Sequence, residues 1–200
     1  MMVVGDNQRM PRPSLADVRR PQLLDAYARC LVRFGLEGST LDRIAEEAGV
    51  TRALVRHYLG NRRDVDRALV AHVRDRYVGW FEGLGAGKPP REGLVAILDA
   101  FFDDGVDQPT QVVDALLGAS AEDPLLQGAL REMYLELEHL LDAQMASAYP
   151  NAEPAARRRT AYAILCLAGT SGSLTALGFP RDRSAAARAS ADRLLEDLRA

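Results

Sequence analysis

The short segment Arg52–Leu59 carries side chains that could read the edges of DNA bases. If it is helical, with about 100° between residues, its polar side chains fall within about 140° of arc and include no acid. That arc consists of Arg52, Ala53, Arg56 and His57. The opposite arc consists of Leu54, Val55, Tyr58 and Leu59. Arginine can bind guanine O6 and N7 with two N–H groups, and histidine can donate to a base-edge acceptor.

The residues around this segment predict how it is held. Leu41–Ala48 has apolar residues at helical spacing, and Gly49-Val50-Thr51 is a tight connection to the next helix. Thr40, Thr51 and Asn61 are good N-caps, with Asp64 completing a short capping box after Asn61. Two short helices joined in this way form a helix-turn-helix, whose second helix enters the major groove of DNA.

Helical periodicity continues along the rest of the chain, with no convincing strand pattern. The pattern predicts a first helix over Val18–Phe34, a fourth from Asn61 towards Trp80, and a break rich in Gly and Pro at 83–90. Five further helices are expected at Arg91–Val106, Thr110–Ser120, Pro124–Ala148, Ala155–Leu177 and Ala185–Leu198. We therefore predict an all-α protein of about nine helices. The expected organisation is a flexible arm at 1–15, a DNA-binding domain at 16–60, a connecting helix at 61–82 and a helical dimerisation and ligand-binding domain at 83–200.

Charge is distributed unevenly along this chain of net charge −3. Residues 1–80 hold fourteen Arg and ten acids, whereas residues 81–200 hold eleven Lys or Arg and eighteen acids. The basic first part favours an anionic partner. An apolar content of 48% supports a sizeable core, and the chain has no membrane-length apolar run and no export signal. The two cysteines, Cys30 and Cys166, fit reduced thiols in the cytoplasm.

The run from Thr40 to Arg62 resembles the DNA-binding signature of the tetracycline-repressor (TetR) family, and the likeness extends through residues 18–76. The resemblance implies phosphate contacts at Thr40, Arg43, Thr51, Tyr58 and Arg62. It also implies groove-facing positions at Arg52, Ala53, Leu54, Arg56 and His57. The sequence departs from the family at Arg56, where tyrosine is frequent, at Leu59, where phenylalanine is usual, and at Arg62, where lysine is usual. We expect Arg56 to change which operator is read.

The resemblance further implies a C-terminal domain that dimerises and encloses a small-molecule pocket. The candidates for the pocket wall are Trp80, Phe101, Phe102, Met133, Tyr134, Tyr162 and Thr170. The candidates for the dimer interface are Leu174, Leu177, Leu194, Leu195 and Leu198. The expected partners are an inverted-repeat operator in double-stranded DNA, a second copy of the chain and a small-molecule effector. No metal, cofactor, membrane or catalytic site is expected.

Two other interpretations stay open. The chain could be a DNA-binding regulator that has no small-molecule effector or that answers to a protein. A helical metal-dependent enzyme is more remote, because Glu136-x-x-His139 has the spacing of a di-iron ligand pair but occurs once. The small residues Gly169–Ser173 allow close approach of another helix or of a ligand, and we favour packing of the dimer-side helices over the ligand.

Overall fold

Capping residues and glycines divide the chain into helices. The computed structural model describes residues 15–103, 108–180 and 182–199. Within these ranges it contains nine α-helices, one short 3-10 helix and no strand, which confirms the all-α prediction. The helices are α1 (Leu15–Gly38), α2 (Leu41–Glu47), α3 (Arg52–Leu59), α4 (Arg62–Gly85), α5 (Pro90–Phe101), α6 (Gln108–Ser120), α7 (Pro124–Ala148), α8 (Pro154–Ala176), α9 (Asp182–Glu196) and η1 (Asp197–Arg199).

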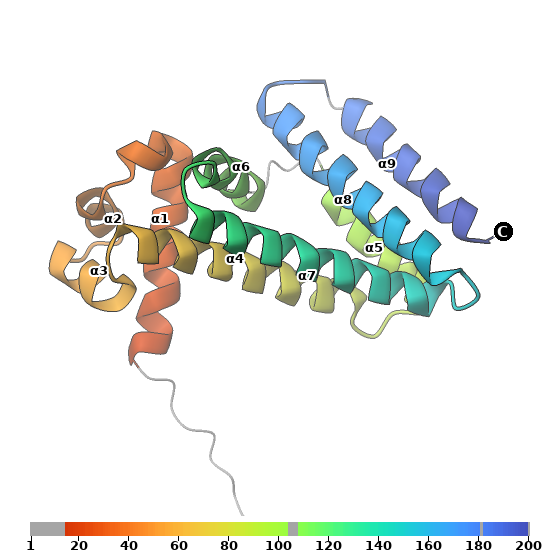
Figure 1. Ribbon diagram of the computed structural model, residues 1–200, viewed down its shortest axis with the longest axis horizontal. Coiled ribbons are helices and arrows are strands. Elements are labelled where there is room, and N and C mark those ends of the chain that lie inside the picture. Colours follow the sequence, from red (N-terminus) through yellow and green to blue (C-terminus); the bar gives the residue numbers. More distant parts are fainter. Residues whose placement is uncertain (1–14, 104–107, 181, 200) are drawn as a thin grey trace, which may run out of the picture.

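Helices α1, α2 and α3 pack into a small bundle at one end of the molecule (Figure 1). Their apolar faces meet in a core that includes Tyr27, Leu31, Ile44, Val55 and Leu59. Burial of side chains of this size typically stabilises a fold by about 1.5–3 kcal/mol each. The core therefore fixes the orientation of α3, whose other face stays exposed.

Helix α4 leads from this bundle into the rest of the molecule (Figure 1). In its first half it packs on α1, where His72 Nε2 lies 2.8 Å from the Asp25 carboxylate. Further along it runs beside α7, where Arg74 Nε lies 3.6 Å from Glu136. Helix α4 thus contacts both α1 of the small bundle and α7 of the larger part of the fold.

Helices α5, α6 and α8 pack on α7, and α9 packs on the outer side of α8 (Figure 1). Helix α8 lies between α7 and α9, α5 covers part of α4 and α7, and α6 packs both on α1 and on α7 and α8. The buried side chains of all these helices form one hydrophobic cluster that is continuous with that of α1–α3. No helix among the described residues is long and apolar enough to cross a membrane.

Several helix ends differ from the sequence prediction. The span of α1 reaches Gly38 because a second short helical segment follows a kink at Gly35, whose φ of 68° and ψ of −179° are not helical. Helix α5 ends at Phe101, and the predicted end at Val106 lies outside the described residues, as does the arm at 1–15 apart from Leu15. Helix α9 ends at Glu196, and η1 carries the chain to Arg199.

Candidate DNA-binding surface and ligand cavity

The turn between α2 and α3 is built by the residues that the sequence marked. The Thr40 hydroxyl accepts from the backbone N–H of Arg43, and the Thr51 hydroxyl accepts from that of Leu54. Gly49 has a φ of 65°, a backbone conformation that few residues other than glycine adopt readily. The caps predicted at Thr40, Thr51 and Asn61 are confirmed, including the capping box between Asn61 and Asp64.

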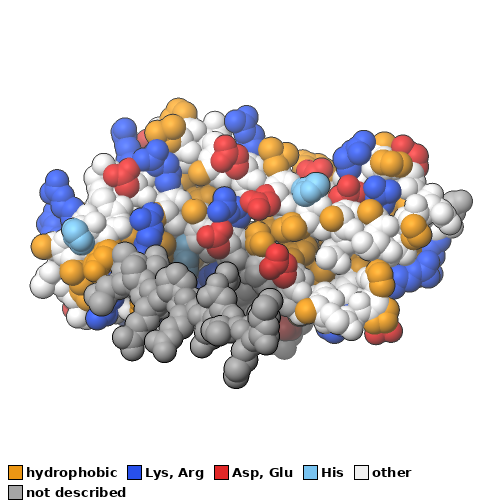
Figure 2. All heavy atoms as spheres, turned by 90° about the horizontal axis from the view of Figure 1, so that it is seen from below, with side chains coloured by type: hydrophobic (Ala, Val, Ile, Leu, Met, Phe, Trp, Pro, Cys, Tyr) orange, Lys and Arg blue, Asp and Glu red, His pale blue; other side chains and the backbone are white. Residues whose placement is uncertain are grey.

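Helix α3 presents a polar face to solvent. The exposed side chains are those of Arg52, Ala53, Arg56 and His57. Val55 and Leu59 are buried, whereas Leu54 and Tyr58 are half-buried. Figure 2 shows Arg and His side chains at the end of the molecule that holds α1–α3. This face matches what a recognition helix needs, because arginine and histidine donors project away from the packed side.

Other polar groups around α3 could position a phosphate backbone. Arg52 forms an exposed ion pair of 2.9 Å with Asp42, and exposed pairs of this kind are weak enough to exchange partners. Arg43 donates to the Gly38 carbonyl at 2.7 Å and lies over the Phe34 ring. The hydroxyls of Thr40 and Thr51 accept from backbone N–H groups, so their own O–H groups remain able to donate.

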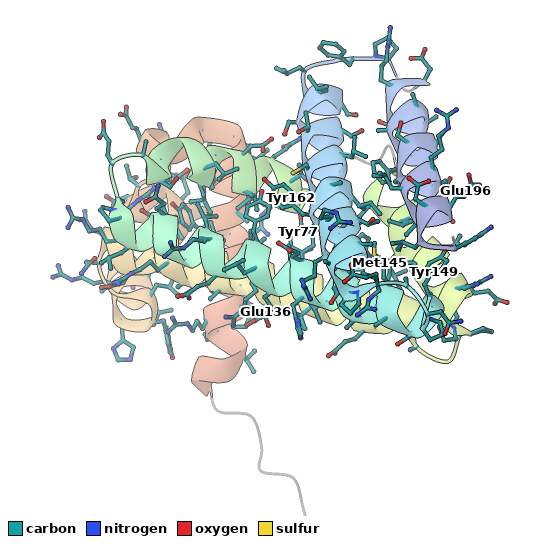
Figure 3. The ribbon with its side chains drawn as sticks, turned by 45° about the vertical axis from the view of Figure 1, so that its right-hand side comes forward. Tyr77, Glu136, Met145, Tyr149, Tyr162 and Glu196 are labelled. Carbon is teal, nitrogen blue, oxygen red and sulfur yellow. The ribbon has the colours of Figure 1, made fainter. Side chains whose placement is uncertain are left out.

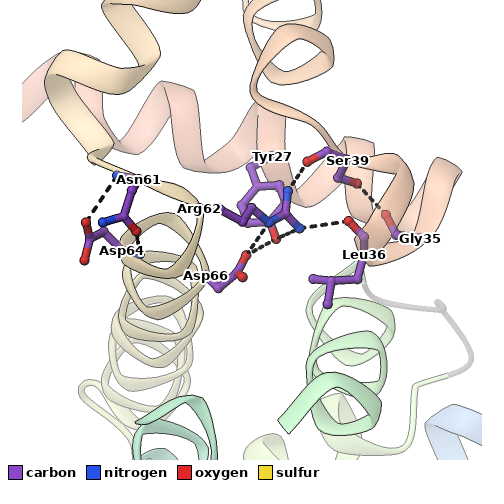
Figure 4. A network of polar contacts seen from close by, with 8 residues as sticks. All are labelled: Tyr27, Gly35, Leu36, Ser39, Asn61, Arg62, Asp64 and Asp66. Atoms are coloured by element: carbon purple, nitrogen blue, oxygen red, sulfur yellow. Dashed lines mark hydrogen bonds and ion pairs between the residues drawn. The ribbon is translucent and has the colours of Figure 1, made fainter. Parts of the chain in front are cut away.

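Arg62 has an inward-facing side chain (Figure 4). Its Nη2 donates to the Tyr27 hydroxyl at 2.7 Å and to the Leu36 carbonyl at 2.8 Å, its Nη1 donates to the Ser39 carbonyl, and its Nε lies 3.2 Å from Asp66. Tyr27 in turn donates to Asp66. Burial and the Asp66 carboxylate raise the pKa of Tyr27, so the phenol stays protonated.

This network bears on the prediction that Arg62 contacts a phosphate. Most of its five N–H groups already have acceptors within the protein, because α4 begins next to the corner between α1 and α2. Arg62 therefore joins α4 to that corner and has little donor capacity left for a phosphate. The neighbouring Arg63 is exposed and has no such network among the described residues.

A cavity of about 660 Å³ lies between the helices of the C-terminal half. Its wall includes residues of α4, α5, α6, α7, α8 and α9. All seven side chains singled out for a pocket line it: Trp80, Phe101, Phe102, Met133, Tyr134, Tyr162 and Thr170. Tyr77 also lines the cavity, although the sequence analysis did not select it. Its place one helical turn before Trp80 could have identified it. Figure 3 shows Tyr77 and Tyr162 extending towards the same region.

The small residues of α8 form part of this wall. A Cβ atom on Gly172 would lie 2.8 Å from the Thr110 side chain of α6, so glycine allows α6 and α8 to approach closely. Residues 169–173 also line the cavity. Both effects occur within one protomer, which favours close packing and cavity formation as the reason for these small residues.

The five candidate interface leucines fall into three groups. Leu177 is 76% exposed, and Leu174 and Leu194 are half-buried. Leu195 and Leu198 are only 4% and 7% exposed, because they pack into the core of the protomer. These last two therefore have almost no side-chain surface left for a partner subunit.

Among the described residues, no group of three or more His, Cys, Asp or Glu side chains is placed to hold a metal ion. Glu136 and His139 therefore have no further ligands beside them in this part of the chain. Glu136 instead lies 3.6 Å from Arg74.

Comparison with known proteins places these features among bacterial regulators. The model of the family "Bacterial regulatory proteins, tetR family" matches residues 23–69. The HTH-type transcriptional regulator BetI of Burkholderia lata is 33% identical over 148 residues, covering 72% of this chain and 76% of that protein. The BetI of Burkholderia mallei is 31% identical over 147 residues, with 72% and 75% covered.

Solved structures are similar over nearly the whole chain. A TetR-family regulator from Cytophaga hutchinsonii has a TM-score of 0.76 at 15% identity, covering 94% of this chain and 98% of that one. A TetR transcription regulator from Haloarcula marismortui has a TM-score of 0.73 at 17% identity, covering 90% and 98%. These structures share the fold seen here.

Proposed function

Because the chain belongs to the TetR family and is a DNA-binding transcription regulator, we propose that it represses transcription as a homodimer which a small molecule releases from an inverted-repeat operator. Each protomer would place α3 in a major groove. A two-fold dimer then requires half-sites about 34–36 Å apart, or a multiple of this. Such a regulator acts in the cytoplasm, where the operator is.

The observation that carries this proposal is the exposed face of α3. Arg56 and His57 project from its middle with no acid beside them, so they are assigned to base edges. Ala53 and Leu54 would contribute apolar contacts in the groove. The positions assigned to phosphates are Thr40, Arg43, Thr51, Arg52 and Tyr58. The corresponding division of the chain is DNA binding by 16–60, connection by 61–82, and dimerisation and ligand binding by 83–200.

The cavity supports control by a small molecule. Its wall includes Trp80 of α4 and Thr110 of α6, and both helices also pack on α1 of the DNA-binding bundle. A ligand that prefers one arrangement of these helices would change the separation of the two α3 helices in the dimer. A shift from 99:1 to 1:99 requires a preference of about 5.5 kcal/mol between the two arrangements.

The test begins with selection of binding sites from random duplexes by the purified full-length protein. We expect an inverted repeat, with protection of both half-sites in footprinting. Affinity should fall steeply with salt, because phosphate contacts release counterions. Selection of a single asymmetric site, or no preference over random DNA, would contradict the proposal.

A further inference from the structure

The charged side chains of the cavity are mostly acidic. Among its described wall residues, Asp103, Asp114 and Glu138 are acids and Arg131 is the one base. Asp114 accepts a hydrogen bond of 2.8 Å from Ser173. In the described part of the chain, no cationic side chain forms an ion pair with Asp114 or Glu138, although such pairs join α7 to α4 and to α8 elsewhere. The described wall residues thus carry more negative than positive charge, and Asp114 and Glu138 have no ion-pair partner among them.

Aromatic rings make up much of the same wall. Trp80 stands edge-to-face with Phe101 at 5.6 Å and with Tyr77 at 6.3 Å between ring centroids. Tyr134 and Tyr162 line the cavity from α7 and α8, and Tyr162 is 62% exposed. Ring faces attract cations that have lost their water, and this attraction adds to that of a carboxylate.

The tyrosines respond to these carboxylates. Burial raises the pKa of Tyr134, and Asp114 raises it further. A hydrogen bond with Cys166 raises the pKa of Tyr162, and Glu138 acts in the same direction. Both carboxylates add to these shifts, so they disfavour a further negative charge in the cavity.

We propose that the cavity binds an organic cation with an aromatic or aliphatic body, in which Asp114 and Glu138 compensate the positive charge and the aromatic rings contact the body. A volume of about 660 Å³ lies within the range of roughly 300–1,000 Å³ typical of sites for drug-sized ligands. This inference rests on the proposed function in one respect: the cation is the effector only if the cavity is the effector site.

The probes are tetraphenylphosphonium and tetraphenylborate, which have nearly the same size and shape and opposite charge. Calorimetric titration of the full-length protein in sodium buffers should show tetraphenylphosphonium binding at least about tenfold more tightly, a difference of about 1.4 kcal/mol. Equal affinity, tighter binding of tetraphenylborate, or binding of neither ion would overturn the inference.

Variants then locate the charge that selects the cation. Asp114→Asn with Glu138→Gln should reduce the preference to less than about threefold, whereas Glu136→Gln should keep it. Glu136 is the matched control, because it is on the same helix as Glu138 and is absent from the cavity wall. A preference that survives the double variant would overturn the assignment. Thermal melting followed by circular dichroism shows whether the variants fold. The comparison of the two ions on the wild-type protein tests the inference even if a variant does not fold.

Operator binding separates this inference from the proposed function. If the protein binds its selected operator but does not prefer the cation, the inference fails and DNA-binding regulation stands. If it prefers the cation but binds no operator, the proposed function fails and the cavity assignment stands.

Discussion

At the scale of single residues, the use of an arginine depends on which acceptors lie within its reach. Arg56 and Arg62 are six positions apart. Arg56 projects into solvent from α3, whereas Arg62 is surrounded by carbonyls, a phenol and a carboxylate at the start of α4. We therefore expect substitutions at the two positions to affect different properties.

Arg56→Ala and His57→Ala should each weaken operator binding by about 1–3 kcal/mol and relax sequence preference. The reason is that each removes a donor assigned to a base edge while leaving the buried face of α3 unchanged. Fluorescence anisotropy titrations on the operator and on a scrambled duplex, at several salt concentrations, measure both effects. Arg43→Ala is the control, since loss of a phosphate contact should weaken binding to both duplexes alike. An equal loss on both duplexes for Arg56→Ala would remove its base-reading role.

Arg62→Ala should lower the free energy of unfolding by about 3 kcal/mol, because it removes the cation beside the buried Asp66 and the donor of the Ser39 carbonyl. Arg62→Lys should restore little of this, since an ammonium cannot reach acceptors in several directions as the planar guanidinium does. Urea unfolding followed by circular dichroism measures these changes. The exposed neighbour Arg63 provides the matched control, and Arg63→Ala should leave stability within about 0.5 kcal/mol. An unchanged unfolding midpoint for Arg62→Ala would show that the network contributes nothing.

At the scale of elements, features set by local chemistry were predictable. Caps at Thr40, Thr51 and Asn61 and the glycine at 49 depend on a few neighbouring residues, so the helices of the DNA-binding bundle could be placed from sequence. The predicted aromatic residues also line the cavity, because large rings at helical spacing mark inward faces, and their contact with a ligand stays a prediction. The inward turn of Arg62 and the burial of Leu195 depend on helices distant in sequence, and no local pattern reveals them.

The wall of α8 offers a test of the cavity that needs no knowledge of the operator. Thr170→Trp should lower the affinity for tetraphenylphosphonium by at least about tenfold, because the indole would occupy the space that the ligand needs. Operator affinity should stay within about tenfold of the wild type. Gln127→Trp is the control, since this exposed residue of α7 lies outside the wall. Equal loss of ligand affinity in both variants, or in neither, would remove Thr170 from the ligand site.

At the scale of the whole molecule, α4 and α6 connect the cavity to the DNA-binding bundle. Both contribute to the cavity wall and both pack on α1, within one continuous hydrophobic cluster. Under the proposed function, a ligand that moved either helix would also move the bundle that carries α3. The distance between two α3 helices is defined only in a dimer. The position of the dimer interface would therefore determine how a movement of α4 or α6 changes that distance.

The end of α8 is the best candidate for that interface. Leu177 is 76% exposed and Phe179, two residues further on, is 49% exposed, and apolar side chains exposed close together often mark a protein–protein contact. Leu177→Glu should raise the dimer dissociation constant by about 100-fold, since two unpaired carboxylates would be buried across the two-fold axis.

Light scattering at several protein concentrations measures this dissociation, and operator titration measures its consequence. The variant should be monomeric where the wild type is dimeric, and it should bind a full operator no better than a half-site. Leu125→Glu is the matched control, because Leu125 is a 59% exposed leucine on α7 and should leave the dimer intact. A dimer mass for Leu177→Glu would place the interface on another face. Dissociation by Leu125→Glu as well would show that the loss reflects added charge rather than position.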